Sequence, residues 1–224
     1  MKKSQLLIKS LIGTLFFLLI LFISAGRINY WQGWLLTTIS IISLLLNSFA
    51  LRNKYELAAE RSEVKSGTKS WDKVIIGLST LTLIITYIVA GLDSGRFQWS
   101  PGFHWGINAT GVVLILSGEV IFLLAQNQNK FFSSLMRIQT DRGHSVCDTG
   151  IYKIIRHPAY FGNIITAIGI PLILGSLWGF MPSVLSIFLT VIRTSLEDKT
   201  LINELDGYSD YTSRTRYRLL PYIW

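Results

Sequence analysis

The chain has 224 residues, half of them hydrophobic, and only 15% of them are charged. Soluble domains usually carry about a quarter charged residues, so this deficit excludes an ordinary soluble fold and indicates a membrane protein. The net charge of +8 could suggest a nucleic-acid partner. Basic loops that set topology and face anionic lipid explain it better, so no nucleic acid is expected. The single cysteine, Cys147, excludes an internal disulfide and a cysteine-based zinc site, and three scattered histidines predict no metal centre.

Six apolar segments follow one another along the chain. The first four have about 20 residues each, enough to cross a hydrocarbon core of roughly 30 Å. The fifth is shorter, and the turn signal Gly175-Ser176 separates it from the sixth, so the last two are predicted to form a helical hairpin. The sequence therefore predicts an all-α, polytopic membrane helical bundle of about six segments, over residues 6–25, 31–51, 74–92, 105–125, 160–174 and 177–196.

The first apolar segment has a second interpretation, as a signal peptide. Lys2 and Lys3 precede it, and Ser24-Ala25-Gly26 places small residues near its end. The apolar run is long for such a peptide, so we expect it to stay in the protein as the first membrane helix.

The distribution of charge predicts the orientation of the bundle. All but two of the 21 Lys and Arg residues fall in alternate loops or at the termini, the exceptions being Arg27 and Arg96. Because basic residues stay on the cytoplasmic side, both termini and both long loops are expected to be cytoplasmic. The mixed-charge loop 52–73 is expected to form a short amphipathic helix on the membrane surface. Residues 1–224 are expected to form a single integral membrane domain, with four membrane helices in 1–125 and the hairpin and polar tail in 126–224. No pattern indicates an oligomeric state.

The predicted hairpin brings distant polar residues to one level of the membrane. At a rise of 1.5 Å per residue, His157 and Glu197 lie roughly 27 and 32 Å from the turn. Arg193 is one helical turn before Glu197 on the same face. We therefore expect Arg193, Glu197 and the Arg156-His157-Pro158 corner to line one pocket. The simpler alternative is that Arg193 and Glu197 form only an i,i+4 ion pair at a helix end.

A longer pattern surrounds these residues. Residues 150–162, G-I-Y-K-I-I-R-H-P-A-Y-F-G, resemble the signature G-x-Y-x-x-x-R-H-P-x-Y-x-G of the isoprenylcysteine carboxyl methyltransferase family, which is related to the phospholipid methyltransferases. Arg193 followed by Glu197-Asp198 resembles the family's R-x-x-x-E-E, and residues 208–224 resemble its closing Y-x-x-Y and R-x-R-L-x-P-x-x-W. The resemblance extends over about residues 50–224. The segment 129–144, which precedes the signature, resembles that of bacterial or archaeal members. Asp198 departs from the pattern, because a second Glu is usual there, and no contact is assigned to it.

The resemblance implies methyl transfer from S-adenosylmethionine inside a membrane. No G-x-G occurs in the sequence, which excludes the Rossmann-type methyltransferase fold. Glu197 is expected to hold the cofactor's amino group, and Arg193 to act catalytically by orienting the substrate through its bidentate fork. Carried over by position, the cofactor-binding residues are Gln139, His144, Ser145, Val146, Cys147, Tyr152, His157, Pro158, Ala159, Tyr160 and Glu197.

The resemblance leaves the methyl acceptor open. We expect a lipophilic small molecule or a lipidated substrate, reached among membrane lipids and methylated on a carboxylate. A carboxylate is already ionised at neutral pH and needs an orienting cation rather than a base. The alternatives are a phospholipid amine, a thiol, or a non-catalytic scaffold that binds lipid. A membrane reductase of related architecture would need a nicotinamide site, which is not evident.

Overall fold

The computed structural model of the chain describes residues 3–50 and 66–224. Every regular element in these ranges is a helix, so the predicted fold class is confirmed. Most of the amphipathic helix expected over 52–73 lies outside the described residues. The helices are α1 (Lys3–Ala25), α2 (Trp31–Ala50), α4 (Ser70–Ala90), the π-helix η1 (Gly91–Phe97), α5 (Trp105–Gln128), the short 3-10 helices η2 (Thr140–Arg142) and η3 (Gly150–Lys153), α6 (Pro158–Leu174), α7 (Phe180–Glu204) and α8 (Tyr208–Arg214).

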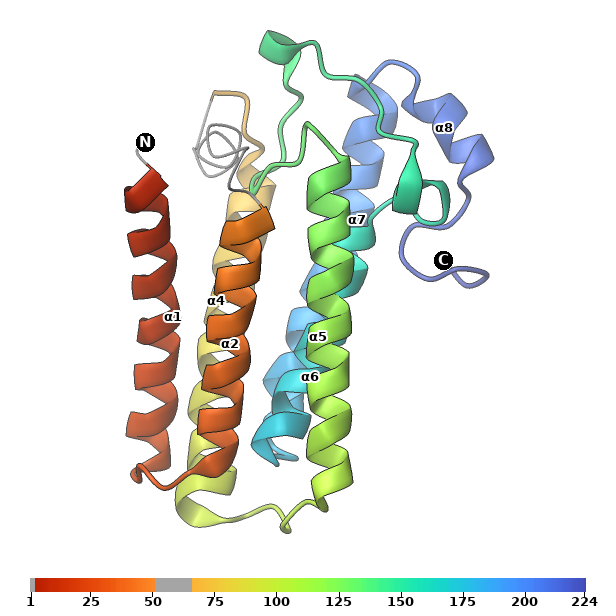
Figure 1. The fold of residues 1–224 in the computed structure, drawn as a ribbon. Helices are drawn as coiled ribbons and strands as arrows, with labels where there is room; N and C mark the ends of the chain where they lie inside the picture. Colours follow the sequence, from red (N-terminus) through yellow and green to blue (C-terminus); the bar gives the residue numbers. More distant parts are fainter. Residues whose placement is uncertain (1–2, 51–65) are drawn as a thin grey trace.

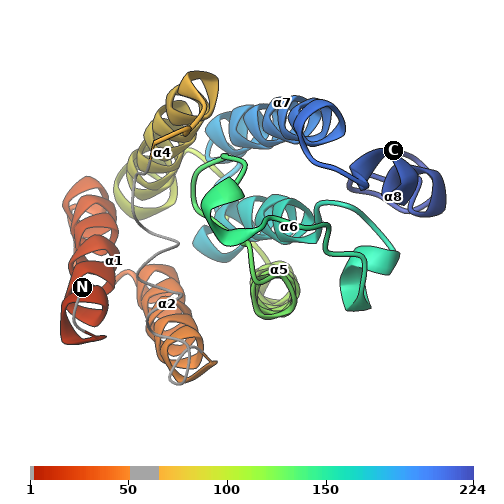
Figure 2. The same ribbon diagram turned by 90° about the horizontal axis from the view of Figure 1, so that it is seen from above.

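The long helices run side by side and form one bundle (Figure 1). Seen from above, α6 lies between α5 and α7, and α4 lies between α7 and α1 (Figure 2). By length and composition, five described helices could cross a membrane, whereas α6 is a shorter apolar helix of 17 residues. The six predicted segments thus become five long helices and one shorter helix. The predicted hairpin of α6 and α7 is confirmed, and Gly175 makes its turn with a φ of +67° that favours glycine.

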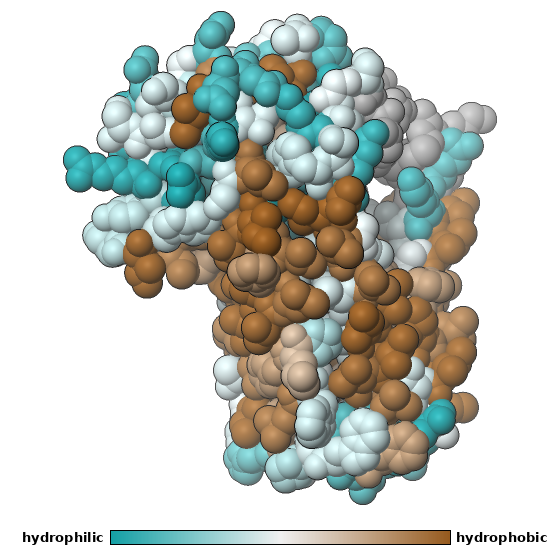
Figure 3. All heavy atoms as spheres, turned by 180° about the vertical axis from the view of Figure 1, so that it is seen from behind, coloured by the Kyte–Doolittle hydropathy of each residue, from teal (hydrophilic) through white to brown (hydrophobic). Residues whose placement is uncertain are grey.

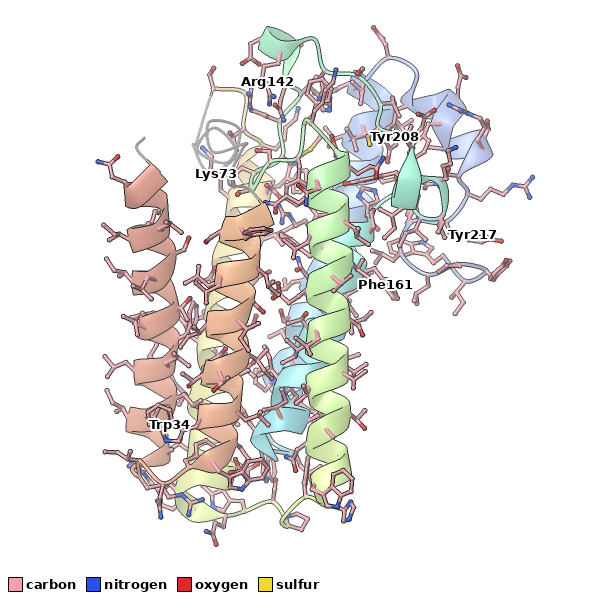
Figure 4. All side chains as sticks on the ribbon, in the orientation of Figure 1. Trp34, Lys73, Arg142, Phe161, Tyr208 and Tyr217 are labelled. Carbon is pink, nitrogen blue, oxygen red and sulfur yellow. The ribbon has the colours of Figure 1, made fainter. Side chains whose placement is uncertain are left out.

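The surface divides into an apolar belt and a polar head. Figure 3 shows hydrophobic side chains covering the long helices and hydrophilic ones gathered at one end. The head contains α8 and the loop between α5 and α6, and the N-terminal end of α1 lies on the same side of the bundle (Figure 1). The exposed Trp34 lies toward the opposite end (Figure 4), and the exposed Trp105 is the first residue of α5. Exposed tryptophans are typical of the aromatic girdle of a membrane protein. The chain is an integral membrane protein.

Glycines bring α5 and α6 into close contact. A Cβ atom on Gly162 would lie 2.5 Å from the carbonyl oxygen of Gly118, and one on Gly111 would lie 2.8 Å from that of Gly169. Helices without a hydrophobic driving force between them associate through such small residues, because their backbones can then pack directly. This contact fixes the start of α6 against α5, and the start of α6 carries the predicted site residues Pro158, Ala159 and Tyr160.

The hairpin turn is supported by polar side chains inside the bundle. The Tyr30 hydroxyl donates to the carbonyl of Leu174, the last residue of α6, at 2.9 Å. The buried carboxylate of Asp93, on η1, accepts from the Ser176 hydroxyl at 2.5 Å and from the Trp178 N–H at 3.3 Å. Backbone groups at membrane depth need such internal partners. The turn is therefore held rigidly, and the hairpin's open end is set at the polar head.

Candidate functional site

One pocket lies in the polar head, at the open end of the α6–α7 hairpin. It has a volume of about 1060 Å³, part of it open to solvent. Its walls come from the start of α6, the last half of α7 and the loop that leads from α5 to η3. Figure 4 shows the labelled Arg142 and Tyr208 in this head, beyond the end of α5. The structure brings all twelve predicted site residues to this pocket: Gln139, His144, Ser145, Val146, Cys147, Tyr152, His157, Pro158, Ala159, Tyr160, Arg193 and Glu197.

Arg193 is held by a carboxylate that the sequence had not pointed to. Its Nε and Nη2 donate to the buried Asp72 at the start of α4, at 2.7 and 3.1 Å. Nη2 also donates to the Ser134 carbonyl at 2.9 Å, and the guanidinium carbon lies 5.0 Å from the centre of the Tyr160 ring. The simple Arg193–Glu197 ion pair is therefore wrong, and the bidentate fork expected to face a substrate faces Asp72. Within residues 3–50 and 66–224, Nη1 donates no hydrogen bond, so that end of the guanidinium remains for another partner.

Glu197 presents its carboxylate to the pocket. The side chain is 19% exposed, its Oε2 accepts from the Tyr160 hydroxyl at 2.5 Å, and its Oε1 lies 3.7 Å from His157 Nδ1. The rings of His157 and Tyr160 stack on each other, with centres 5.7 Å apart and planes 9° from parallel. The carboxylate is thus fixed by neighbours from the first turn of α6, and it keeps room for a further donor.

Asp198, one residue later, has the opposite surroundings. Its side chain is fully buried and accepts from Arg156 Nε at 2.8 Å and Nη2 at 2.9 Å. It also accepts from Arg218 Nε at 2.8 Å and the Tyr208 hydroxyl at 2.9 Å, and it lies 3.2 Å from His157 Nε2. Asp198 therefore joins the hairpin to α8 and the C-terminal segment, and it does not line the pocket. The sequence assigned it no contact, and the structure gives it this joining role.

Part of the chain, including the residues around the pocket, is similar in sequence to known proteins. Residues 107–205 match the family model described as phospholipid methyltransferase. Protein-S-isoprenylcysteine O-methyltransferase B of Arabidopsis thaliana is 30% identical over 102 residues, which cover 42% of this chain and 52% of that protein. A probable protein-S-isoprenylcysteine O-methyltransferase of Oryza sativa subsp. indica is 34% identical over 67 residues, 30% of this chain and 35% of that protein. Protein-S-isoprenylcysteine O-methyltransferase A of Arabidopsis thaliana is 32% identical over 72 residues, 31% of this chain and 36% of that protein.

Over part of its length, the chain is similar to proteins named isoprenylcysteine O-methyltransferases. The matched part of the chain spans about half of the first of these relatives and about a third of the other two. The match to the phospholipid methyltransferase family model begins near the start of α5 and ends just after α7, so it includes the hairpin and the loop before it.

Two histidines of this pocket have opposite charge preferences. Burial alone would lower the pKa of His157, but its contacts with Asp198 and Glu197 outweigh burial and raise that pKa above its ordinary value. An imidazolium between two carboxylates is stabilised by both. Burial, together with the positive charges of two nearby arginines, lowers the pKa of His144 to about 4. His144 is therefore neutral at neutral pH, and its Nδ1 accepts from the Gln139 N–H at 3.2 Å.

Some of the residues that the sequence predicts to bind the cofactor already form hydrogen bonds within the protein. The amide of Gln139 donates to the Phe131 carbonyl and accepts from Arg142, both at 2.6 Å, so its side chain shapes the loop. The Tyr152 hydroxyl donates to the Ala125 carbonyl at 3.3 Å, which ties η3 to the end of α5. These two side chains build the pocket wall with their polar ends and leave only their remaining surfaces for a ligand.

Asp72 and Asp198 lie behind the pocket lining, and the sequence predicted a partner for neither of them. Asp72 stands at the beginning of a long apolar helix and is fully buried, and a buried carboxylate in such a place requires a cation. Asp198 could be distinguished from Glu197 only by knowing which face of α7 meets Arg156, and the sequence does not show that.

Proposed function

We propose that this chain is an S-adenosylmethionine-dependent membrane methyltransferase that methylates a carboxylate on a lipophilic or lipidated acceptor, with residues 1–224 acting as one domain. One observation carries the proposal: a single pocket at the hairpin's open end combines the Glu197 carboxylate, the Tyr160 ring and the fixed guanidinium of Arg193. A prenylated cysteine is the acceptor that the names of the relatives suggest.

The donor set of the pocket fits the cofactor. S-adenosylmethionine supplies an electrophilic methyl group on a sulfonium and also carries an ammonium and an adenine. Glu197 can accept a charge-assisted hydrogen bond from the ammonium, since its carboxylate lines the pocket. Aromatic side chains can contact a cation or a base through their faces. The proposed cofactor-binding residues are Gln139, His144, Ser145, Val146, Cys147, Tyr152, His157, Pro158, Ala159, Tyr160 and Glu197.

Arg193 would orient the acceptor rather than move a proton. Asp72, Ser134 and the Tyr160 ring hold the guanidinium in one position, and Nη1 remains to donate to an acceptor carboxylate. Such a preformed donor stabilises the correct alignment without reorganising during the reaction. Asp72 acts through Arg193 and is a positioning residue.

Methylation of a phospholipid amine is the second candidate function. The match of residues 107–205 to the phospholipid methyltransferase family model favours it. So does the occupied fork of Arg193, because a neutral amine would not need the second nitrogen of a bidentate donor. An amine acceptor predicts that Arg193 substitutions affect turnover little.

We also propose that both termini are cytoplasmic. The N-terminal end of α1 and the polar head share one end of the bundle, and basic residues gather in the loops of that end. Reporter fusions before residue 1 and after Trp224 test this orientation. A signal from the opposite compartment at either end would contradict it.

Cofactor binding is the direct test of the site. Titration calorimetry on protein in detergent or nanodiscs is expected to show S-adenosylmethionine binding, weakened by His157→Ala and by Tyr160→Phe. Asp210→Asn, on the exposed face of α8, is the matched control and should bind as the parent does. A screen of lipid extracts with a labelled methyl donor then identifies the acceptor. Absence of binding in the folded parent would leave the non-catalytic scaffold as the better description.

A further inference from the structure

The last segment of the chain exposes a compact set of apolar side chains. Leu220 is 40% exposed, Tyr222 88% and Ile223 77%, and Ile154 on the neighbouring segment is 57% exposed. The two segments lie side by side because the backbone N–H groups of residues 156 and 157 donate to the carbonyls of residues 217 and 218. We call Ile154, Leu220, Tyr222 and Ile223 the C-terminal foot.

The foot lies at the level of the bundle rather than above it. In Figure 1 the C-terminal loop lies at the level of the upper turns of α5, below the rest of the polar head. Figure 3 shows hydrophobic atoms on the underside of the overhanging head, next to the apolar belt of the long helices. An apolar surface that continues the membrane-facing belt meets the same solvent as that belt.

We propose that the C-terminal foot is seated in the bilayer, at the boundary between headgroups and acyl chains of the leaflet nearest the polar head. The exposed basic residues Lys153 and Arg216 flank the foot in sequence and would face anionic headgroups. Aliphatic and aromatic side chains beside Lys and Arg are the composition of interfacial anchors. Tyr222 has a φ of +68°, a conformation rare outside glycine, and the turn that it makes leaves its own side chain exposed.

The foot is connected to the pocket through the same segment. Arg218 Nε donates to the buried Asp198 at 2.8 Å, and its guanidinium lies 5.0 Å from the Trp224 ring. The backbone pairing at residues 156 and 157 joins the segment to the corner that begins α6. Lipid contact at the foot thus holds in place a segment that supports the pocket wall. The bilayer thereby helps to fix the shape of the pocket.

Spin-label depth measurements test this seating without any assay of activity. Tyr222→Cys and Ile223→Cys are each labelled in a Cys147→Ala background and placed in nanodiscs of phosphatidylcholine and phosphatidylglycerol. Ser213→Cys, exposed on α8, is the matched control. We expect labels at 222 and 223 to collide preferentially with oxygen and to be protected from a nickel chelate, whereas the label at 213 meets the chelate freely.

Labels at 222 and 223 that meet the nickel chelate as freely as the label at 213 would overturn the proposal. So would protection that persists in dilute detergent together with dipolar coupling between labels, because a second copy of the chain would then cover the foot. Two independent label positions keep the test decisive if one variant fails to fold.

Discussion

The adjacent carboxylates Glu197 and Asp198 are predicted to fail in different ways when their charge is removed. Asp198→Asn places an amide against Arg156, Arg218 and His157, which all point hydrogen-bond donors at a fully buried site. Removing one partner of a buried charge pair costs about 3–5 kcal/mol. At about 2–4 °C per kcal/mol for a chain of this size, the melting temperature should fall by roughly 6–20 °C.

Glu197→Gln should leave stability nearly unchanged and weaken cofactor binding. The glutamine keeps an oxygen for the Tyr160 hydroxyl but loses the charge that would face an ammonium. A hydrogen bond to a charged group contributes about 1.5–3 kcal/mol, so affinity should fall about 10- to 150-fold. The assay is a thermal melt paired with calorimetric titration of S-adenosylmethionine for each variant, with the exposed Asp206→Asn as the control. The reasoning is refuted if Asp198→Asn is no less stable than the control, or if Glu197→Gln loses stability and keeps its affinity.

Three further outcomes are expected. Arg193→Lys should keep cofactor affinity and lose about tenfold or more in methyl-transfer rate, because lysine keeps the charge without the planar donor set; an unchanged rate would favour the amine acceptor. Gly118→Ala should lower the melting temperature by several degrees, since a Cβ there would meet the Gly162 carbonyl at 2.5 Å, whereas Gly77→Ala, with nothing within 4 Å, should not. The raised pKa of His157 means that its stabilising contribution is complete below about pH 6.5 and is lost as pH rises through the folded-state pKa. The difference in melting temperature between the parent and His157→Gln should therefore be larger near pH 6 than near pH 9, and an equal difference at both would contradict the charged imidazolium.

The fold could be predicted because hydropathy records the membrane solvent directly. The apolar runs gave the helices to within a few residues at most ends, and the turn at Gly175 followed from small residues between two apolar segments. The extent of α7 was underestimated, since its last turns leave the apolar region and continue to Glu204 as a polar helix. A hydropathy pattern ends where the membrane ends, whereas a helix ends where its hydrogen bonds do.

Twelve of the residues that line the pocket could be predicted, but the hydrogen bonds among them could not. Spacing from the hairpin turn placed His157 and Glu197 at one level, and the structure brings both to the pocket. The partner of Arg193 required the packing of α4 against α7, a contact between residues more than a hundred positions apart. Neither periodicity nor local spacing encodes such a pairing, so the fork of Arg193 was assigned to a substrate when the protein itself uses it.

The chemical form of the transferred methyl group tests the central claim most directly. Protein in nanodiscs is incubated with S-adenosylmethionine carrying a labelled methyl group and a prenylated cysteine with a free carboxylate, and the product is then treated with mild base. A carboxyl methyl ester releases its label as methanol under these conditions, whereas a methylated amine or thioether keeps it. We predict base-labile label that depends on Arg193 and Glu197. Label that resists base, or none transferred by protein that binds the cofactor, would contradict carboxylate methylation.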